Sequence, residues 1–126
     1  MILDTNAISA FADGEPGLLK EIREMALALY LPVVALGEFR YGLTSSRQRA
    51  ARARWLDELE TNCAVLEITS ETSRVYAEIR HELRVLGRPI PENDIWIAAL
   101  ARCHRLPVLS IDRHFDQVSG LRRVGW

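Results

Sequence analysis

Met1-Ile2-Leu3-Asp4-Thr5-Asn6 opens the sequence, and this stretch decides how the rest of the chain is interpreted. Its three apolar residues predict a short buried strand that ends at Asp4. Asp4 or Thr5 can then cap a helix that continues to about Phe11. A carboxylate therefore stands where a strand gives way to a helix, and comparable positions recur further along the chain.

Strands and helices alternate through the remaining sequence. Apolar residues at helical spacing predict the helices, and short apolar runs bounded by turn residues predict the strands. The helix after the stiff connector 89–91 is apolar almost all round, so we expect it inside the molecule. We expect helices at about 18–29, 36–43, 47–60, 70–86 and 92–103, and strands at about 30–34, 64–68, 107–110 and 121–126. Such alternation predicts an α/β fold with a central parallel β-sheet flanked by α-helices.

Size and composition limit the class of protein. The chain has 126 residues, of which 48% are hydrophobic, which suits one domain spanning 1–126 with one sizeable core. No apolar run reaches the roughly 18 residues of a membrane helix, and no signal-peptide pattern opens the chain. We therefore expect a cytoplasmic protein that has no membrane partner.

The cysteines and histidines do not form a convincing zinc site. Cys63 and Cys103 stand apart from each other, and so few thiols suit a reducing compartment. Cys103 could be combined with His104, His81 and His114, but adjacent residues rarely share one metal ion and no CxxC or HxxxH spacing is present. A core position is the better interpretation of both cysteines.

Basic residues are unusual in kind rather than in number. The formal net charge is −1, and all sixteen basic residues except Lys20 are arginines. Arginine contacts phosphate through a planar, bidentate guanidinium, although genome base composition explains an arginine preference equally well. Bulk charge therefore does not predict nucleic-acid binding by itself.

Four acidic residues occupy comparable points of the predicted fold. Asp4 and Asp112 follow strands, Glu38 comes shortly after a strand, and Asp94 lies in the first turn of a helix. In a parallel sheet the carboxyl ends of the strands and the N-termini of the following helices share one edge. We therefore expect these four side chains to converge.

Converging carboxylates repel one another unless some are protonated or a cation binds them. Ligation by oxygen alone favours hard ions, so the set predicts Mg²⁺ or Mn²⁺ rather than zinc. Such a site suits phosphodiester hydrolysis, because the metal lowers the pKa of an attacking water and neutralises charge at phosphorus.

Each acidic residue also has a structural explanation. Asp4 can cap a helix, Asp94 can complement a helix dipole, Asp112 can form an Asx turn and Glu38 can be a solvated helix position. Asp94 fits its explanation least well, because it leads into a helix that is predicted to be buried. Asp116 is a possible additional acidic residue, for which a turn role is equally plausible.

Four segments resemble the motifs of PIN-domain nucleases, and of VapC-type toxins in particular. The resemblance spans the whole chain, and four motifs in the right order and spacing make it specific. The segments are Ile2-Leu3-Asp4-Thr5-Asn6, Gly37-Glu38-Phe39-Arg40-Tyr41-Gly42, Asn93-Asp94-Ile95-Trp96-Ile97-Ala98-Ala99 and Leu109-Ser110-Ile111-Asp112-Arg113-His114-Phe115.

This resemblance implies a PIN fold and a metal-dependent endoribonuclease that acts as the toxin of a VapBC-type toxin–antitoxin module. It implies that Asp4, Glu38, Asp94 and Asp112 are the catalytic residues and bind Mg²⁺ or Mn²⁺, with Asp4 and Asp94 as principal ligands. Thr5, Asn6 and Ser110 would orient the ligands or the substrate, with Ser110 standing where many relatives carry Thr. The resemblance further implies a homodimer, a cognate VapB-type antitoxin that covers the site, and RNA products with 5′-phosphate and 3′-hydroxyl ends.

Arginines next to the second motif are candidates for RNA contact. Arg40, Arg47 and Arg49 lie within ten residues, where they could hold the RNA backbone. A solvated helix face with local ion pairs explains the same residues at least as well.

Three other functions compete with this one. A phosphoacceptor receiver domain also gathers acidic residues and Mg²⁺ at strand ends, but it needs a late lysine, and Lys20 is the only lysine. A non-catalytic PIN-like binding module is disfavoured by the intact acidic positions. An RNA-processing PIN nuclease outside a toxin system remains open.

Overall fold

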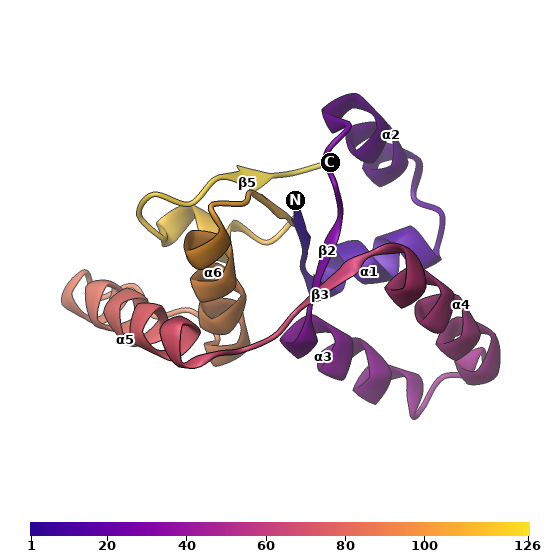
Figure 1. Ribbon diagram of the computed structural model, residues 1–126, viewed down its shortest axis with the longest axis horizontal. Coiled ribbons are helices and arrows are strands. Elements are labelled where there is room, and N and C mark those ends of the chain that lie inside the picture. Colours follow the sequence, from indigo (N-terminus) through magenta and orange to yellow (C-terminus); the bar gives the residue numbers. More distant parts are fainter.

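The computed structural model describes residues 1–126, and it has a five-stranded, fully parallel β-sheet with helices on both sides (Figure 1). The sheet order is β3-β2-β1-β4-β5. The strands are short: β1 Ile2–Leu3, β2 Tyr30–Pro32, β3 Ala64–Leu66, β4 Val108–Leu109 and β5 Arg123–Val124. The predicted α/β class with a central parallel sheet is confirmed.

Strand β1 lies at the point where the chain reverses its direction of travel across the sheet. The chain runs from β1 outward through β2 to β3, and then returns to place β4 on the other side of β1. Ile2 pairs with Tyr30 on one side and with Val108 on the other. The crevice beyond the carboxyl ends of strands at such a switch point is where α/β proteins bind ligands.

Six α-helices and one 3₁₀-helix connect the strands. In Figure 1, α5 and α6 lie on one side of the strands and α1 to α4 on the other. Their bounds are α1 Thr5–Ala12, α2 Pro16–Met25, α3 Val33–Leu43, α4 Arg49–Asn62, α5 Ser70–Val85, α6 Glu92–His104 and the 3₁₀-helix η1 Arg113–Gln117.

Several predicted boundaries were wrong by a few residues. Strand β2 ends at Pro32, and α3 begins at Val33 with Pro32 as its N-cap. Proline lacks the N–H that would continue a ladder, so the β-branched residues after it join the helix instead. Helix α2 begins earlier than expected because Pro16 suits the first helical position, and it ends at Met25, where Ala26 is left-handed with φ of 47°. Helix α4 begins at Arg49, which leaves Arg47 in the preceding turn.

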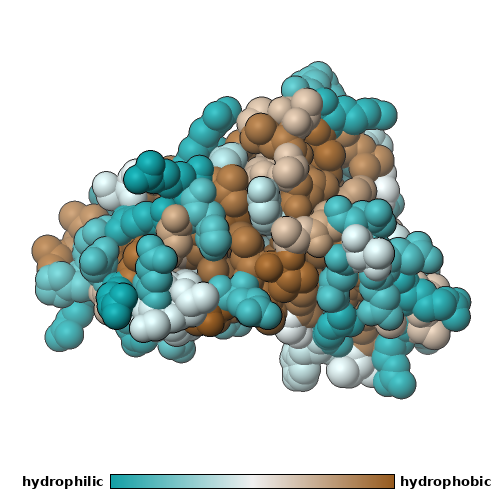
Figure 2. All heavy atoms as spheres, in the orientation of Figure 1, coloured by the Kyte–Doolittle hydropathy of each residue, from teal (hydrophilic) through white to brown (hydrophobic).

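The core is one continuous cluster of buried apolar side chains built around β1, β4 and α6. Helix α6 packs against both α3 and α5, and six of its residues are buried, as its apolar sequence predicted. Figure 2 shows hydrophilic side chains over α5 and α4 and hydrophobic ones over the middle of the same face. None of the helices combines the length and apolar character that crossing a bilayer requires.

We predict that Leu100→Ala destabilises the protein by about 2–5 kcal/mol, because Leu100 is fully buried in α6 and its truncation leaves a cavity. The matched variant Leu86→Ala, at a residue that is 60% exposed, should change the free energy of unfolding by less than about 0.5 kcal/mol. Urea unfolding followed by circular dichroism measures both. Equal effects of the two variants would contradict the placement of α6 in the core.

Candidate functional site

A polar cleft lies at the carboxyl ends of β1 and β4, where the topology predicts a ligand site. Its volume is about 510 Å³ and no hydrophobic side chain lines it. All four predicted carboxylates line it, together with five neighbours from β1–α1 and the start of α6: the full lining is Asp4, Thr5, Asn6, Glu38, Pro91, Glu92, Asn93, Asp94 and Asp112. Residues that are far apart in sequence are thus brought together by the switch point.

Asp4 is the most deeply buried member of the cleft, with 3% of its surface exposed. It is the N-cap of α1, and its Oδ1 accepts a hydrogen bond from the backbone N–H of Ala7 at 2.8 Å. The hydroxyl of Ser110, fully buried at the end of β4, donates to Asp4 Oδ2 at 2.5 Å. The structural role expected of Asp4 as a cap and its place in the cleft therefore coexist, because each oxygen has a separate partner.

Ser110 also fixes the loop that carries Asp112. Its Oγ accepts a hydrogen bond from the backbone N–H of Asp112 at 2.8 Å. Asp112 in turn caps η1 by accepting from the backbone N–H of His114 at 2.9 Å. One serine hydroxyl thus bridges the carboxylate after β1 and the loop after β4.

The imidazole of His114 lies between two of the carboxylates. Its Nδ1 is 3.1 Å from Asp94 Oδ2 and 2.9 Å from Asp112 Oδ1. One ligand atom from each of these three residues falls within 4.8 Å of the others, a spacing that suits a metal ion. His114 therefore joins α6 to the β4–η1 loop at the rim of the cleft.

Glu38 reaches the cleft from α3, one and a half turns after the helix begins. Its Oε1 and the nearby Thr5 Oγ1 are buried, and neither has a partner within ordinary hydrogen-bond geometry, although Thr5 and Asn93 lie close enough to the carboxylate to lower its pKa. Buried polar atoms without partners are rare in native proteins and indicate an unfilled role such as ligand binding. These two atoms are the strongest sign that the cleft is built to receive a ligand.

Burial, and to a smaller extent mutual repulsion, raises the pKa values of Asp4, Glu38 and Asp94. Burial raises the pKa of Asp4 to about 6, against the lowering effect of its hydrogen bonds to Ser110 and Ala7. Burial also raises the pKa of Glu38, and the charge of Asp94 adds to that rise. The pKa of Asp94 is raised by burial despite the hydrogen bond to His114. A cation in the cleft would relieve this cost, because it favours the charged forms.

The predicted arginines lie away from the cleft lining. Arg40 forms ion pairs with Asp57 and Glu60 of α4, as the local ion-pair explanation anticipated. Arg47 and Arg49 are exposed and form no ion pair within the chain. In sequence they flank Gln48, which lines a second hollow that shares Thr5 and Glu38 with the cleft; neither arginine lines that hollow itself.

Asp116, the fifth acidic candidate, lies outside the cleft lining and pairs with Arg123 of β5. Both its oxygens accept from that guanidinium, at 2.8 and 3.0 Å, and this contact holds the pKa of Asp116 below its usual range. A third nitrogen, Nη1 of Arg123, donates to the carbonyl of Ser110 at 3.0 Å. Asp116 therefore supports the loop that carries Ser110 and Asp112.

Sequence reasoning missed three contributors to the site. His114 was considered only for zinc, although it follows Asp112 by two residues within the fourth motif. Asn93 lines the cleft beside Asp94, and its adjacency in the third motif was the available signal. For Arg123 the sequence carried no signal, because its contact with Ser110 depends on the pairing of β5 with β4.

Comparison with known proteins agrees with this geometry. The family model described as the PIN domain matches residues 1–121. The chain belongs to the PIN-domain family. The resemblance expected from the four motifs is therefore confirmed, and the chain is similar to proteins named VapC.

Two relatives are named as VapC ribonucleases. The chain is 34% identical to ribonuclease VapC5 of Mycobacterium tuberculosis over 73% of this chain and 70% of that protein. It is 30% identical to VapC ribonuclease Y4jK of Sinorhizobium fredii over 96% of this chain and 93% of that protein. In structure it resembles VapBC2 of Rickettsia felis bound to a promoter DNA fragment, with a TM-score of 0.89, 21% identity and coverage of 99% and 97% of the two chains. This last likeness supports the fold.

We predict that the metal-free protein, in the presence of chelator, loses stability as pH rises from about 4 to 7. The pKa of Asp4 is about 6 in the folded protein, against 3.8 for an unperturbed aspartate as in the unfolded chain. Folding therefore favours the protonated form of Asp4. The contribution of Asp4 to the free energy of unfolding is present in full below pH 4 and is lost as pH rises through 6. The shift corresponds to about 3 kcal/mol.

Urea unfolding across this pH range measures the slope. In the Asp4→Asn variant the side chain is uncharged at every pH and can still accept the hydrogen bond from the Ala7 N–H. The variant should therefore show a smaller change of unfolding free energy with pH. An Asp4→Asn protein with the wild-type pH dependence would contradict the assignment of the titration to Asp4.

Proposed function

We propose that this PIN-domain protein is a metal-dependent endoribonuclease that hydrolyses RNA phosphodiester bonds as the toxin of a VapBC-type toxin–antitoxin module. The observation that carries the proposal is the convergence of Asp4, Glu38, Asp94 and Asp112 in one cleft at the β1/β4 switch point. The relatives named ribonuclease VapC match nearly the full chain, which supports the same activity.

The cleft residues fit a hard divalent cation. The four carboxylates offer only oxygen ligands, and Mg²⁺ and Mn²⁺ prefer such ligands. Glu38 Oε1 is buried without a partner, and burial raises the pKa values of Asp4 and Asp94, so a cation would stabilise their charged forms. We propose that Asp4, Glu38, Asp94 and Asp112 hold the ion, and that Nδ1 of His114 orients Asp94 and Asp112 rather than binding the ion.

A bound divalent ion would polarise a phosphate oxygen and lower the pKa of the attacking water. The chain's own residues set the geometry for this chemistry. Asp4 is fixed by Ala7 and Ser110, and Asp112 is fixed by Ser110 and the start of η1. Thr5 and Asn6, at the N-terminal turn of α1, border the same cleft, where they are placed to hold a phosphate oxygen or the water that attacks it.

The proposed partners follow from the same relatives. Structures similar to this chain include VapBC-5 of Mycobacterium tuberculosis, described as a member of a toxin–antitoxin family, at 30% identity and a TM-score of 0.75. We propose that a VapB-type antitoxin binds this chain and that the toxin itself is a homodimer. Exposed apolar side chains, including Tyr41 at 80% and Val85 at 71% exposure, provide surface for such contacts.

We predict that Asp94→Asn lowers ribonuclease activity at least about 100-fold, because loss of a ligand exceeds the 10- to 100-fold effect of residues that merely support ligands. The measurement maps new RNA 5′ ends in cells after a brief pulse of the wild-type protein or the variant. Glu78→Gln, an exposed acid-to-amide change outside the cleft, is the matched control and should cut like wild type. Wild-type cleavage by Asp94→Asn would exclude the proposed site.

We predict that Arg123 positions the Ser110–Asp112 loop. Arg123→Met removes the contacts to Asp116 and to the Ser110 carbonyl, so it should lower activity about tenfold and raise the Mn²⁺ concentration for half-maximal rate. Arg123→Lys should recover part of both effects. A loss of stability to urea with an unchanged Mn²⁺ dependence would indicate a purely structural role.

A further inference from the structure

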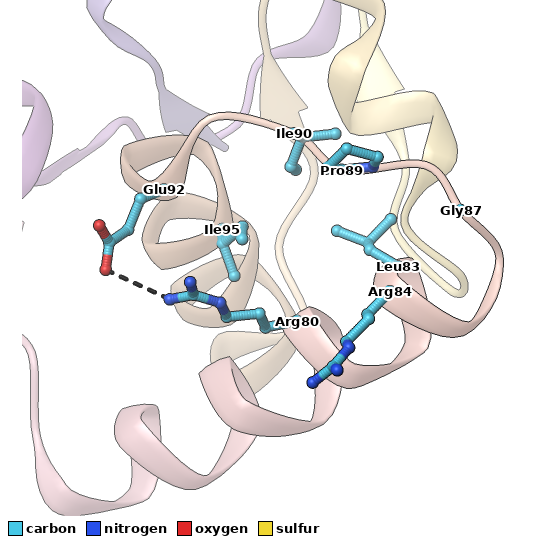
Figure 3. Close-up of a pocket in the computed structure, with 8 residues that line it drawn as sticks. All are labelled: Arg80, Leu83, Arg84, Gly87, Pro89, Ile90, Glu92 and Ile95. Carbon is cyan, nitrogen blue, oxygen red and sulfur yellow. Dashed lines mark ion pairs between the residues drawn. The ribbon is translucent and has the colours of Figure 1, made fainter.

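A second cavity adjoins the acidic cleft on its α5 side, and its chemistry is the opposite of the cleft's (Figure 3). Its volume is about 350 Å³. Leu83 of α5, Ile90 of the α5–α6 connector and Ile95 of α6 turn their side chains toward one another to form its floor. Arginines, rather than carboxylates, dominate its rim.

The two arginines at the rim differ in whether their guanidinium groups already have partners. Arg80 forms an ion pair with Glu92 and donates to the hydroxyl of Tyr76 at 2.6 Å. Arg84, one helical turn further along α5, is exposed, and its side chain forms neither an ion pair nor a hydrogen bond within the chain. The rim therefore presents one fixed and one free guanidinium to an anion.

The cavity borders the cleft. Glu92 lines both hollows. Ile90 lines the cavity, and Pro91, the next residue in sequence, lines the cleft. On the opposite side, the hollow beside Gln48 shares Thr5 and Glu38 with the cleft. Three hollows thus follow one another across the molecule, and the middle one holds the carboxylates.

We propose that the cavity between α5 and α6 is a subsite for one unpaired nucleotide of the RNA substrate, with the base on the apolar floor and its phosphate at Arg84. This inference rests on the ribonuclease function proposed above. Because the cleft itself is acidic, a polyanion needs cationic contacts beside it, and Arg84 supplies a free one. Unpaired bases that are splayed out and stacked against side chains or guanidinium planes are the usual targets of sequence-specific RNA recognition.

The distance suits a nucleotide close to the cleaved bond. Only the first turn of α6 separates the cavity from the cleft, and a helix with its side chains is about 10–12 Å across. The volume falls in the range of small-molecule pockets, about 300–1,000 Å³, so it accommodates one base rather than a helix of a protein partner. The subsite would therefore select the base at one position a few nucleotides from the cut.

The test compares Arg84→Glu and Ile90→Phe with the matched control Arg74→Glu, an exposed arginine on the same helix that forms no ion pair. Arg84→Glu reverses the charge at the rim and Ile90→Phe fills the cavity. A random-sequence 20-nucleotide single-stranded RNA is the probe. Cleavage in Mn²⁺, followed by sequencing of the product ends, gives the base preference at each position, and fluorescence anisotropy in the Asp94→Asn background gives the affinity without cleavage.

We expect both cavity variants to lose the base preference at one position while they still cut, and Arg84→Glu to weaken binding about tenfold. Arg74→Glu should match wild type in both measurements. Cleavage by both variants with unchanged preference and affinity would overturn the subsite and leave the ribonuclease function standing.

Two further outcomes separate the proposals. Binding that depends on Arg84 without any cleavage by the wild type would support the subsite and contradict the nuclease. A wild type that neither binds nor cuts the probe would overturn both. If Arg84→Glu weakens only the inhibition by a co-expressed antitoxin, the cavity belongs to the protein partner and the subsite is wrong.

Discussion

The hydrogen bond between the buried Ser110 hydroxyl and Asp4 is the contact on which the site depends. It joins the ends of β1 and β4, the two strands that flank the switch point. A buried carboxylate without such donors is costly, because an unpaired polar group in the interior loses the full free energy of its hydration. Two donors stabilise Asp4 at the centre of the sheet, and the same serine then fixes Asp112. The fold and the candidate site therefore share one polar centre.

Around that centre the carboxylates are held from separate elements. Asp4 follows a strand, Glu38 projects from α3, Asp94 lies in the first turn of α6 and Asp112 is the N-cap of η1. Each element is anchored in the common apolar core, so the separations among the carboxylates are set by packing rather than by mobile loops. Burial, with a smaller contribution from mutual repulsion, raises the pKa values of Asp4, Glu38 and Asp94. Stability and ligand affinity thus oppose each other within the same four residues.

The sequence predicted the parts of this structure that follow from local pattern. Apolar periodicity located α6 and its burial, and the order of strands and helices indicated which carboxylates share an edge of the sheet. It failed where tertiary contacts decide the outcome. The β-branched Val33 and Val34 suggested strand but lie in α3, because the ladder stops at Pro32. Arg123 could not be assigned at all, since its contact with Ser110 exists only through strand pairing.

Charge explains why the site needs the surfaces beside it. An acidic cleft attracts cations but repels the RNA backbone, so the carboxylates alone would oppose substrate binding. Arg40 is paired with Glu60 and Arg123 with Asp116, so neither guanidinium is free to hold a phosphate. The unpaired Arg84 lines the apolar cavity, and the unpaired Arg47 and Arg49 flank in sequence Gln48, which lines the other hollow. An RNA strand bound at both hollows would cross the carboxylates that lie between them. The hollows would then supply the binding affinity and the cleft the chemistry.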